Sequence, residues 1–372
     1  MEIGITTDIV DSTKYHKGVS NYIRYLIKNI AKIQTNHNFH LIHFQKNSDA
    51  IYQLDLEEII VPRYPILSPG VSKLLTTAIR VPNQLENLDV IHIPEPHLSM
   101  LPLYLRSDIK TVLTLHGGHL YVEPGTEPKF YESPKAWAYL KLLGLSFPKF
   151  RDKIDMYIAV SNFLKKEMIE RLKIPEEKIR VIYEAADEKF RPGNFEKSTD
   201  FILSDTPGRE LIEIYYKLRK RGIKHKLVVF SVRAANKIAE EMAVRLGIQK
   251  DVIIAGYVPD EELIKLYNTA DLYVRIPLVE RFGIPPLEAM ACGCPVVTNN
   301  VGSLPEVVGD AGILKNPGDI EGLVNAIYEV LTNEGLRQDM IKKGLERAKM
   351  FSWEKTAKET MKVYEEVYNS NS

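Results

Sequence analysis

Short apolar runs alternate with segments of helical period along almost the whole chain, and this alternation constrains the fold more than any other feature. The apolar runs have the length of buried strands, and the stripe in residues 19–30 has the spacing of one helix face. The pattern predicts β-α units stacked around parallel sheets. We expect strands at residues 3–6, 89–93, 110–115 and 154–160, near 201, and at 227–230, 252–255, 272–274 and 296–298.

A chain of 372 residues is too long for one ordinary hydrophobic core, so two domains are expected. The composition changes in residues 183–199, a stretch of Glu, Ala, Asp, Pro, Gly and Asn without apolar period. We interpret this stretch as the linker between an N-terminal domain, residues 1–190, and a C-terminal domain, residues 195–350. Helices are expected to begin at Ser161, Asp319 and Leu336, and a final one at Ser352.

Charge and cysteine content exclude several classes of protein. The 49 basic and 49 acidic residues cancel, so the bulk charge does not favour a nucleic-acid partner. Cys292 and Cys294 are separated by one glycine, a spacing that hardly permits an unstrained disulfide. The first residues read as a core strand without a signal-peptide pattern, and no apolar run reaches membrane-spanning length. We therefore expect a cytoplasmic protein with reduced, buried thiols.

The segment 280–297 carries the strongest indication of function. It places Glu280 on a loop and Glu288 just inside a helix, and a buried strand follows. Gly283 allows the backbone to turn, and the two prolines after Ile284 suit a first helical turn. Amides at a helix N-terminus carry partial positive charge and can hold a phosphate. A carboxylate beside them can accept hydrogen bonds from a vicinal diol, so the grouping suits a nucleotide-linked sugar.

The spacing of the two glutamates means little by itself, because acidic residues in a first helical turn commonly stabilise the helix dipole. The whole string 280–312, however, resembles the signature of the retaining GT-B glycosyltransferases of family 4, the glycogen-synthase-like and mannosyltransferase-like group. The resemblance covers nearly the whole chain and includes residues 158–162, 174–182, 256–258, 261–263 and 351–357.

The resemblance implies an α/β GT-B fold, in which two Rossmann-like domains face each other across a cleft. The C-terminal helix, residues 352–372, would cross back and join the N-terminal domain. The implied activity is transfer of a mannose- or glucose-type hexose from a GDP- or UDP-linked donor to an acceptor hydroxyl. The acceptor would be a glycan, a lipid-linked molecule or a small molecule. The chain has no Asp-x-Asp motif, so we expect no metal and no cofactor beyond the donor substrate.

The resemblance also assigns residues to the site. Glu280 would contact the transferred sugar and Glu288 the ribose, and the catalytic pair would be His116 and Glu280. A histidine at a strand end is more often a structural hydrogen-bonding group, and this alternative stays open for His116. The remaining donor-binding residues would be Gly18 in a loop before the first helix, Arg209, Tyr257 and Val258 beside the base, Arg281, and the backbone at Phe282, Gly283 and Ile284.

The chain departs from the family at one point. Relatives usually carry two basic residues in the loop after the first strand of the second domain, where they neutralise the diphosphate. The corresponding stretch here, residues 201–210, is shortened and holds only Arg209. Arg281 is our first candidate for a replacement, and the others are Arg233, Lys237 and Arg275. The shortened loop keeps open one alternative, a catalytically weak relative that binds nucleotide or glycan. A sugar-nucleotide epimerase, which shares the GT-B architecture, is a second alternative.

Aromatic and aliphatic residues alternate with lysines in residues 135–151. Such a segment can contact an anionic membrane surface or hold a lipid-linked acceptor. It can equally be an amphipathic helix that packs on the N-terminal sheet, with its lysines extended to solvent. A peripheral membrane contact is therefore one of two interpretations of this segment.

Overall fold

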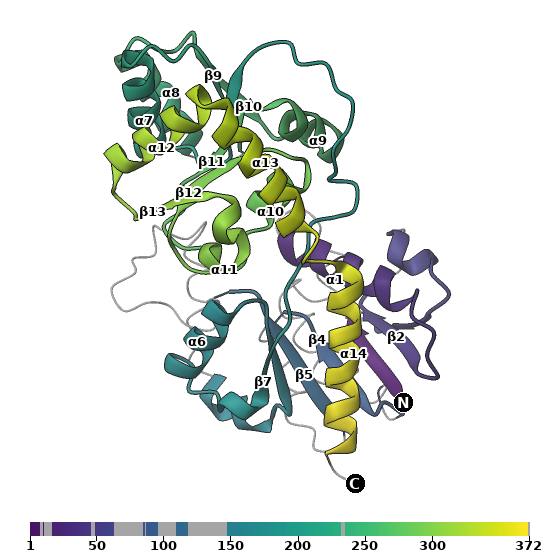
Figure 1. Cartoon of the computed structure of the whole chain (residues 1–372). Coiled ribbons are helices and arrows are strands. Elements are labelled where there is room, and N and C mark those ends of the chain that lie inside the picture. Colours follow the sequence, from purple (N-terminus) through teal and green to yellow (C-terminus); the bar gives the residue numbers. More distant parts are fainter. Residues whose placement is uncertain are drawn as a thin grey trace. The chain divides into compact units, whose positions relative to one another are not determined.

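The computed structural model describes residues 1–7, 10, 17–45, 49–62, 85, 87–95, 109–117, 147–231 and 235–370. It divides into two compact units (Figure 1). Unit 1 comprises Met1–Glu184 and Trp353–Ser372, and unit 2 comprises Ala185–Ser352. No helix in the described part of the chain is both long and apolar enough to cross a bilayer.

Unit 1 is built on a seven-stranded sheet in which every neighbouring pair is parallel. The strand order is β3-β2-β1-β4-β5-β6-β7, so the order reverses between β1 and β4, as in Rossmann folds. The strands are β1 (Glu2–Thr6), β2 (Asn38–His43), β3 (Glu57–Ile60), β4 (Val90–Ile93), β5 (Lys110–Leu115), β6 (Met156–Ala159) and β7 (Ile179–Val181). The helices are α1 (Lys17–Ile30), α6 (Asn162–Glu170) and α14 (Trp353–Asn369), with short 3-10 helices at Ala50–Gln53, Phe147–Lys149, Arg151–Lys153 and Glu176–Lys178.

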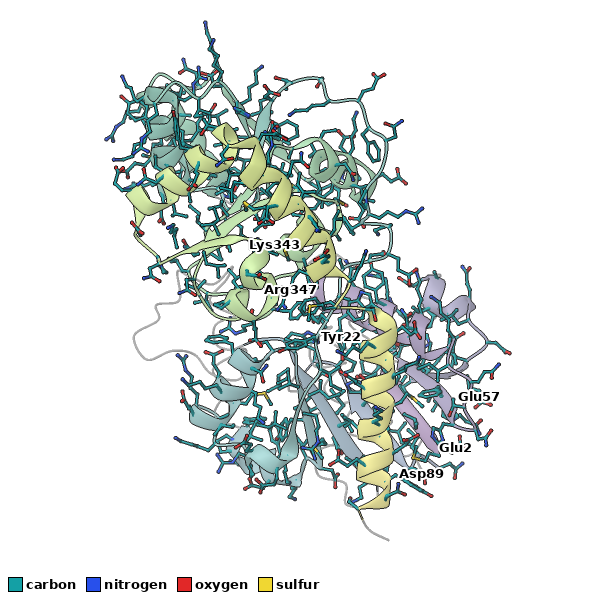
Figure 2. All side chains as sticks on the ribbon, in the orientation of Figure 1. Glu2, Tyr22, Glu57, Asp89, Lys343 and Arg347 are labelled. Carbon is teal, nitrogen blue, oxygen red and sulfur yellow. The ribbon has the colours of Figure 1, made fainter. Side chains whose placement is uncertain are left out.

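The C-terminal helix α14 is attached to unit 1 through a buried polar contact. His92 on β4 lies between the hydroxyls of Tyr364, 2.6 Å from Nδ1, and Thr114, 2.7 Å from Nε2. Burial lowers the pKa of His92 to about 3, so the ring is neutral and donates from one nitrogen only. At the start of the helix, Trp353 packs against Tyr22 of α1, which Figure 2 labels, and their ring centroids are 5.7 Å apart. His92 is therefore part of the core.

Unit 2 has a six-stranded sheet, again with every neighbouring pair parallel. The order β10-β9-β8-β11-β12-β13 reverses between β8 and β11. The strands are β8 (Phe201–Ser204), β9 (Lys226–Phe230), β10 (Val252–Gly256), β11 (Leu272–Arg275), β12 (Val296–Asn299) and β13 (Ile313–Lys315). The helices are α7 (Arg209–Lys220), α8 (Ala235–Arg245), α9 (Asp260–Thr269), α10 (Ile284–Ala291), α11 (Leu304–Val308), α12 (Ile320–Thr332) and α13 (Glu334–Ala348), with a 3-10 helix at Gly309–Ala311.

The strands expected from apolar runs are confirmed, as is the helix cap at Ser161, whose hydroxyl accepts from the amide of Leu164 at 3.1 Å. Four further strands, β2, β3, β7 and β13, show no continuous apolar run in the sequence. The expectation that Gly18 lies in a loop before the first helix is wrong, because α1 begins at Lys17 and Gly18 is in its first turn. Most of the aromatic segment 135–151 lies outside the described residues, but Phe147 and Phe150 at its end are buried.

Candidate functional site

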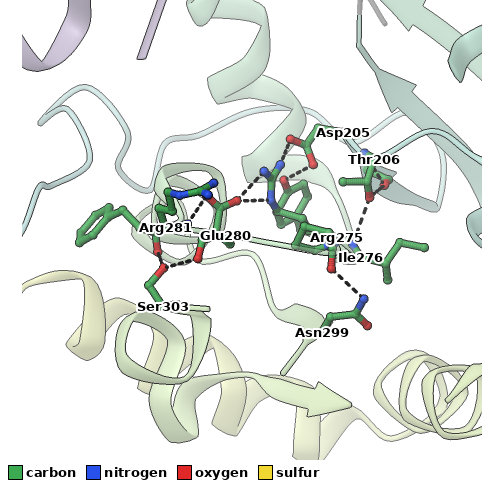
Figure 3. Close-up of polar contacts among 12 residues, drawn as sticks. Asp205, Thr206, Arg275, Ile276, Glu280, Arg281, Asn299 and Ser303 are labelled. Carbon is green, nitrogen blue, oxygen red and sulfur yellow. Dashed lines mark hydrogen bonds and ion pairs between the residues drawn. The ribbon is translucent and has the colours of Figure 1, made fainter. Parts of the chain in front are cut away.

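The carboxyl ends of β8 and β11 meet in unit 2 at the point where the strand order reverses. Open α/β sheets bind their ligands at such a point, because the loops after the two strands diverge there. Asp205 and Thr206 follow β8 directly, and Arg275 is the last residue of β11. The loop after β11 carries Glu280, so four polar side chains from distant parts of the sequence gather at one edge (Figure 3).

Arg275 connects two carboxylates at this edge. Its Nη1 donates to Asp205, and its Nη2 and Nε donate to Oε2 of Glu280 at 2.7 and 3.2 Å. The side chain of Arg275 is only 9% exposed. Burial by itself lowers the pKa of this guanidinium, but the charges of Asp205 and Glu280 outweigh burial and hold the pKa well above its usual range. The network therefore holds three charges in a largely dry environment.

Neighbouring side chains fix this network from the strand side. The hydroxyl of Tyr273 donates to Oδ1 of Asp205 at 2.7 Å, and Thr206 Oγ1 accepts from the amide of Ile276 at 3.1 Å. Asn299, at the end of β12, donates from Nδ2 to the carbonyl of Pro277 at 3.0 Å. These contacts hold the first residues of the loops after β8 and β11, from which the charged side chains extend.

The backbone of the Glu280 loop is fixed by the segment that follows β12. The amide of Ser303 donates to the carbonyl of Glu280 at 3.1 Å, and its hydroxyl donates to the carbonyl of Phe282 at 2.7 Å. Gly302 makes this approach possible, since a Cβ at that position would lie 1.8 Å from the Glu280 carbonyl oxygen. A side chain at position 302 is thus incompatible with the observed loop.

Helix α10 begins immediately after this loop with no side-chain cap. Its N-cap is Gly283, whose φ of 110° is a left-handed value that favours glycine. Pro285 and Pro286 carry no N–H, so the amides of Gly283 and Ile284 are the ones that this helix end can offer to an anion. Glu288 lies one turn further along and is half-buried; burial, reinforced by Asp260 and other carboxylates, raises its pKa to about 8. Ile284 is half-buried as well. Phe282 is buried, and its ring packs against Phe351 with the two ring centroids 6.0 Å apart.

Most of the other residues expected to bind the donor in unit 2 are exposed, among those that the structure describes. Tyr257 follows β10 and is 58% exposed, and Val258 beside it is half-buried. Arg209 is exposed in the first turn of α7. Arg281 donates its backbone amide to Oε1 of Glu280 at 3.2 Å. Lys237 is exposed and pairs with Glu241 at 3.9 Å, and Arg233 lies outside the described residues.

In unit 1, His116 follows β5 and is paired with a carboxylate that the sequence did not indicate. Its Nδ1 lies 2.8 Å from Oε1 of Glu184, and both side chains are about nine-tenths buried. Burial lowers the pKa of His116, but the hydrogen bond and charge of Glu184, with a smaller effect of Glu95, raise it overall. Within the described residues, its Nε2 has no hydrogen-bond partner of ordinary geometry. His119 lies outside the described residues.

Several residues of the two sites had no signal of their own in the sequence. Asp205 and Glu184 are single carboxylates in polar stretches. Gly302 and Ser303 lie inside the string 280–312, but the sequence does not indicate their contact with the Glu280 loop. Asp205 could have been found from its place directly after the first strand of the second sheet. Across the described parts of the chain, no three His, Cys, Asp or Glu side chains gather in a way that would hold a metal ion.

Replacing Gly302 by alanine is expected to displace the Glu280 loop. The matched control is Gly318→Ala: both glycines have positive φ, 58° and 81°, but a Cβ at 318 meets nothing within 4 Å. Gly318→Ala should lower the free energy of unfolding by about 1–2 kcal/mol, because only the left-handed backbone conformation disfavours alanine there. Gly302→Ala adds the steric clash and should lower the free energy of unfolding by about 3 kcal/mol or more. Scanning calorimetry measures both. Equal losses in the two variants would show that the contact between residues 302 and 280 does not hold the loop.

Glu184→Gln should lower the pKa of His116, because it removes the charge that outweighs burial. The raised pKa means that the pair stabilises the folded state fully below the pKa of an unfolded histidine, and that this contribution is lost as the pH rises through the folded-state pKa. NMR titration of the His116 ring measures the change. The exposed Glu177→Gln is the control and should leave the titration unaltered. An unchanged pKa in Glu184→Gln would contradict the assigned cause.

Comparisons with known proteins agree with this geometry. Residues 16–190 match the family Glycosyltransferase Family 4, and residues 209–347 match the family Glycosyl transferases group 1. The O-antigen chain mannosyltransferase B of Escherichia coli is 29% identical over 274 residues, which are 68% of this chain and 70% of that protein. The serotype-specific mannosyltransferase WbdA of the same organism is 28% identical over 55% of this chain, but the alignment spans only 28% of WbdA.

Solved structures share the fold. The crystal structure of HepE from Anabaena, in complex with UDP and glucose, superimposes with a TM-score of 0.74 at 16% identity, covering 98% of this chain and 100% of HepE. The chain contains two parallel Rossmann-like sheets with their helices. The two matched families together span most of its sequence. The chain belongs to the GT-B glycosyltransferases of the family 4 group, and it is a glycosyltransferase.

Proposed function

We propose that this enzyme is a retaining hexosyltransferase that transfers a mannose- or glucose-type sugar from a GDP- or UDP-linked donor to an acceptor hydroxyl. The observation that carries the proposal is the placement of the Glu280 carboxylate beside the uncapped N-terminus of α10, at the strand reversal of unit 2. An anion and a polyhydroxylated group can be bound side by side there. The UDP and glucose bound by HepE and the mannosyl transfer named for the Escherichia coli relative support this choice of donors.

The donor can be assigned to the site group by group. The amides of Gly283 and Ile284 would bind the diphosphate, Glu280 would accept hydrogen bonds from the sugar hydroxyls, and Glu288 would contact the ribose. Tyr257 and Val258 would flank the base. Because the pKa of Glu288 is about 8 without ligand, a diol that binds its ionised form must displace a proton near neutral pH.

His116 in unit 1 would approach the sugar, with its ring hydrogen-bonded to Glu184, and Gly18 would lie near the donor phosphates. The acceptor oxygen attacks the anomeric carbon on the face from which the diphosphate leaves, and its proton passes to a departing phosphate oxygen. No separate general base is assigned. The acceptor would be a glycan, a lipid-linked molecule or a small molecule, and the enzyme would act in the cytoplasm, with or without contact to a membrane surface.

A second candidate is a catalytically weak member of the family that binds nucleotide without transfer. Its support is the ion-paired state of Arg275 together with the shortened basic loop. A thermal-shift panel of GDP-mannose, UDP-glucose and related donors identifies the ligand, and mass spectrometry of reactions with candidate acceptors then detects the product. Stabilisation by a donor without any product, with acceptors of all three classes, would favour the second candidate.

Glu280→Gln should reduce turnover with the identified donor by about tenfold or more, because an amide cannot replace a carboxylate that accepts from two hydroxyls. The substitution keeps the shape of the side chain, so folding should be preserved. The control is Glu329→Gln on the exposed face of α12, which should leave turnover unchanged. A loss smaller than tenfold in Glu280→Gln would remove Glu280 from the reacting centre.

Turnover should persist in the presence of EDTA. We assign the neutralisation of the diphosphate to protein groups, since the chain has no Asp-x-Asp motif and α10 offers uncapped amides. The measurement compares initial rates with EDTA, with added magnesium and with added manganese. Complete loss of activity on chelation, restored by either metal, would contradict the metal-independent mechanism.

A further inference from the structure

The shortened loop after β8 leaves the donor diphosphate without the basic pair that relatives carry. Among the expected replacements, Arg209 is exposed on α7, and Lys237 is exposed and paired with Glu241. Arg275 differs from both, because its guanidinium is 9% exposed and lies at the strand reversal where the ligand is expected. Arg275 ends β11, which pairs with β8, so it lies at the same end of the sheet as the shortened loop after β8.

The hydrogen bonds of Arg275 leave part of its donor capacity unused. A guanidinium has five N–H groups in a fixed plane. Nε and one N–H of Nη2 donate to Glu280, and one N–H of Nη1 donates to Asp205. These bonds use three of the five N–H groups, and the nearby hydroxyl of Tyr273 can accept a fourth. At least one terminal N–H is then left to donate to a phosphate oxygen, as a charge-assisted hydrogen bond.

Charge balance requires further positive groups around Arg275. Two carboxylates on one guanidinium leave the network with one net negative charge, which alone would repel a diphosphate. Helices α7 and α10 begin within four residues of Asp205 and Glu280, and neither has a side-chain cap. Each N-terminus contributes roughly half a positive charge. Together they offset the excess carboxylate, so that Arg275 can donate to an anion beside α10.

We propose that Arg275 binds the departing diphosphate in place of the missing basic pair, and that Asp205 and Glu280 hold its guanidinium in position. This inference rests on the proposed function. As the bond between the anomeric carbon and the phosphate oxygen breaks, its electron pair stays on that oxygen. The acceptor oxygen forms the new bond to carbon and its proton passes to the phosphate. Arg275 keeps its own protons and stabilises the charge by hydrogen bonding.

The test compares nucleoside diphosphates with monophosphates. Isothermal titration calorimetry with UDP, UMP, GDP and GMP gives the affinity ratio of diphosphate to monophosphate for the base that binds. Arg275→Met should lower this ratio about tenfold or more, and Arg275→Lys should retain part of it because a point charge remains. The control is Arg219→Met, which breaks an ion pair with Asp251 (3.1 Å) at the other end of α7 and should keep the wild-type ratio.

Arg275→Met leaves the buried Asp205 carboxylate with the Tyr273 hydroxyl but without its cation. If that variant does not fold, the double variant Asp205→Asn/Arg275→Met removes the uncompensated negative charge, and the affinity ratio is measured on it instead. A wild-type ratio in a folded Arg275→Met or double variant, even with reduced turnover, would overturn the inference, because Arg275 would then act only through Glu280. Failure of the wild-type protein to bind any of the four nucleotides would overturn the proposed function as well, so the two failures can be distinguished.

Discussion

The ion pairs of Arg275 with Asp205 and Glu280 connect the fold of unit 2 to its chemistry. They join the ends of two neighbouring parallel strands to the loop that enters α10. A buried charge without a partner is costly, so each member of this network restricts the positions of the other two. Tyr273 and the Ser303 contacts extend the restriction to the strand and to the backbone of the loop. The Glu280 carboxylate is thereby fixed before any ligand binds, which lowers the ordering cost of binding.

Much of the fold could be predicted from the sequence because buried parallel strands appear as apolar runs. The missed strands have another character: in β3, Glu57 and Glu58 are exposed at the edge of the sheet, and β13 is half-buried throughout. Edge strands of this kind lack the continuous apolar signal on which the prediction relied. The start of α1 was misplaced because the glycine at position 18 suggested a loop, although glycine is tolerated in an exposed first turn.

The site could be predicted only where its residues belong to one continuous string. Glu280, Gly283 and Glu288 are candidates from the sequence because they are close together and suit a loop followed by a helix, and the structure shows that loop and helix. The pairing of Arg275 with Asp205 joins positions 70 residues apart, and that of His116 with Glu184 joins positions 68 apart. Such pairs follow from strand order, which sequence spacing does not give. Arg281 is the first candidate cation in the sequence because it follows Glu280 directly, and the structure adds Arg275, whose side chain donates to that carboxylate.

The most direct test of this account is a crystal structure of the protein with the nucleoside diphosphate that binds it. The account predicts that the phosphates lie at the N-terminus of α10. At least one terminal nitrogen of Arg275 should then be about 2.7–2.9 Å from a phosphate oxygen, while the guanidinium remains hydrogen-bonded to Asp205. A nucleotide bound away from the ends of β8 and β11, or phosphates held there with Arg275 still bonded to the two carboxylates alone, would contradict it.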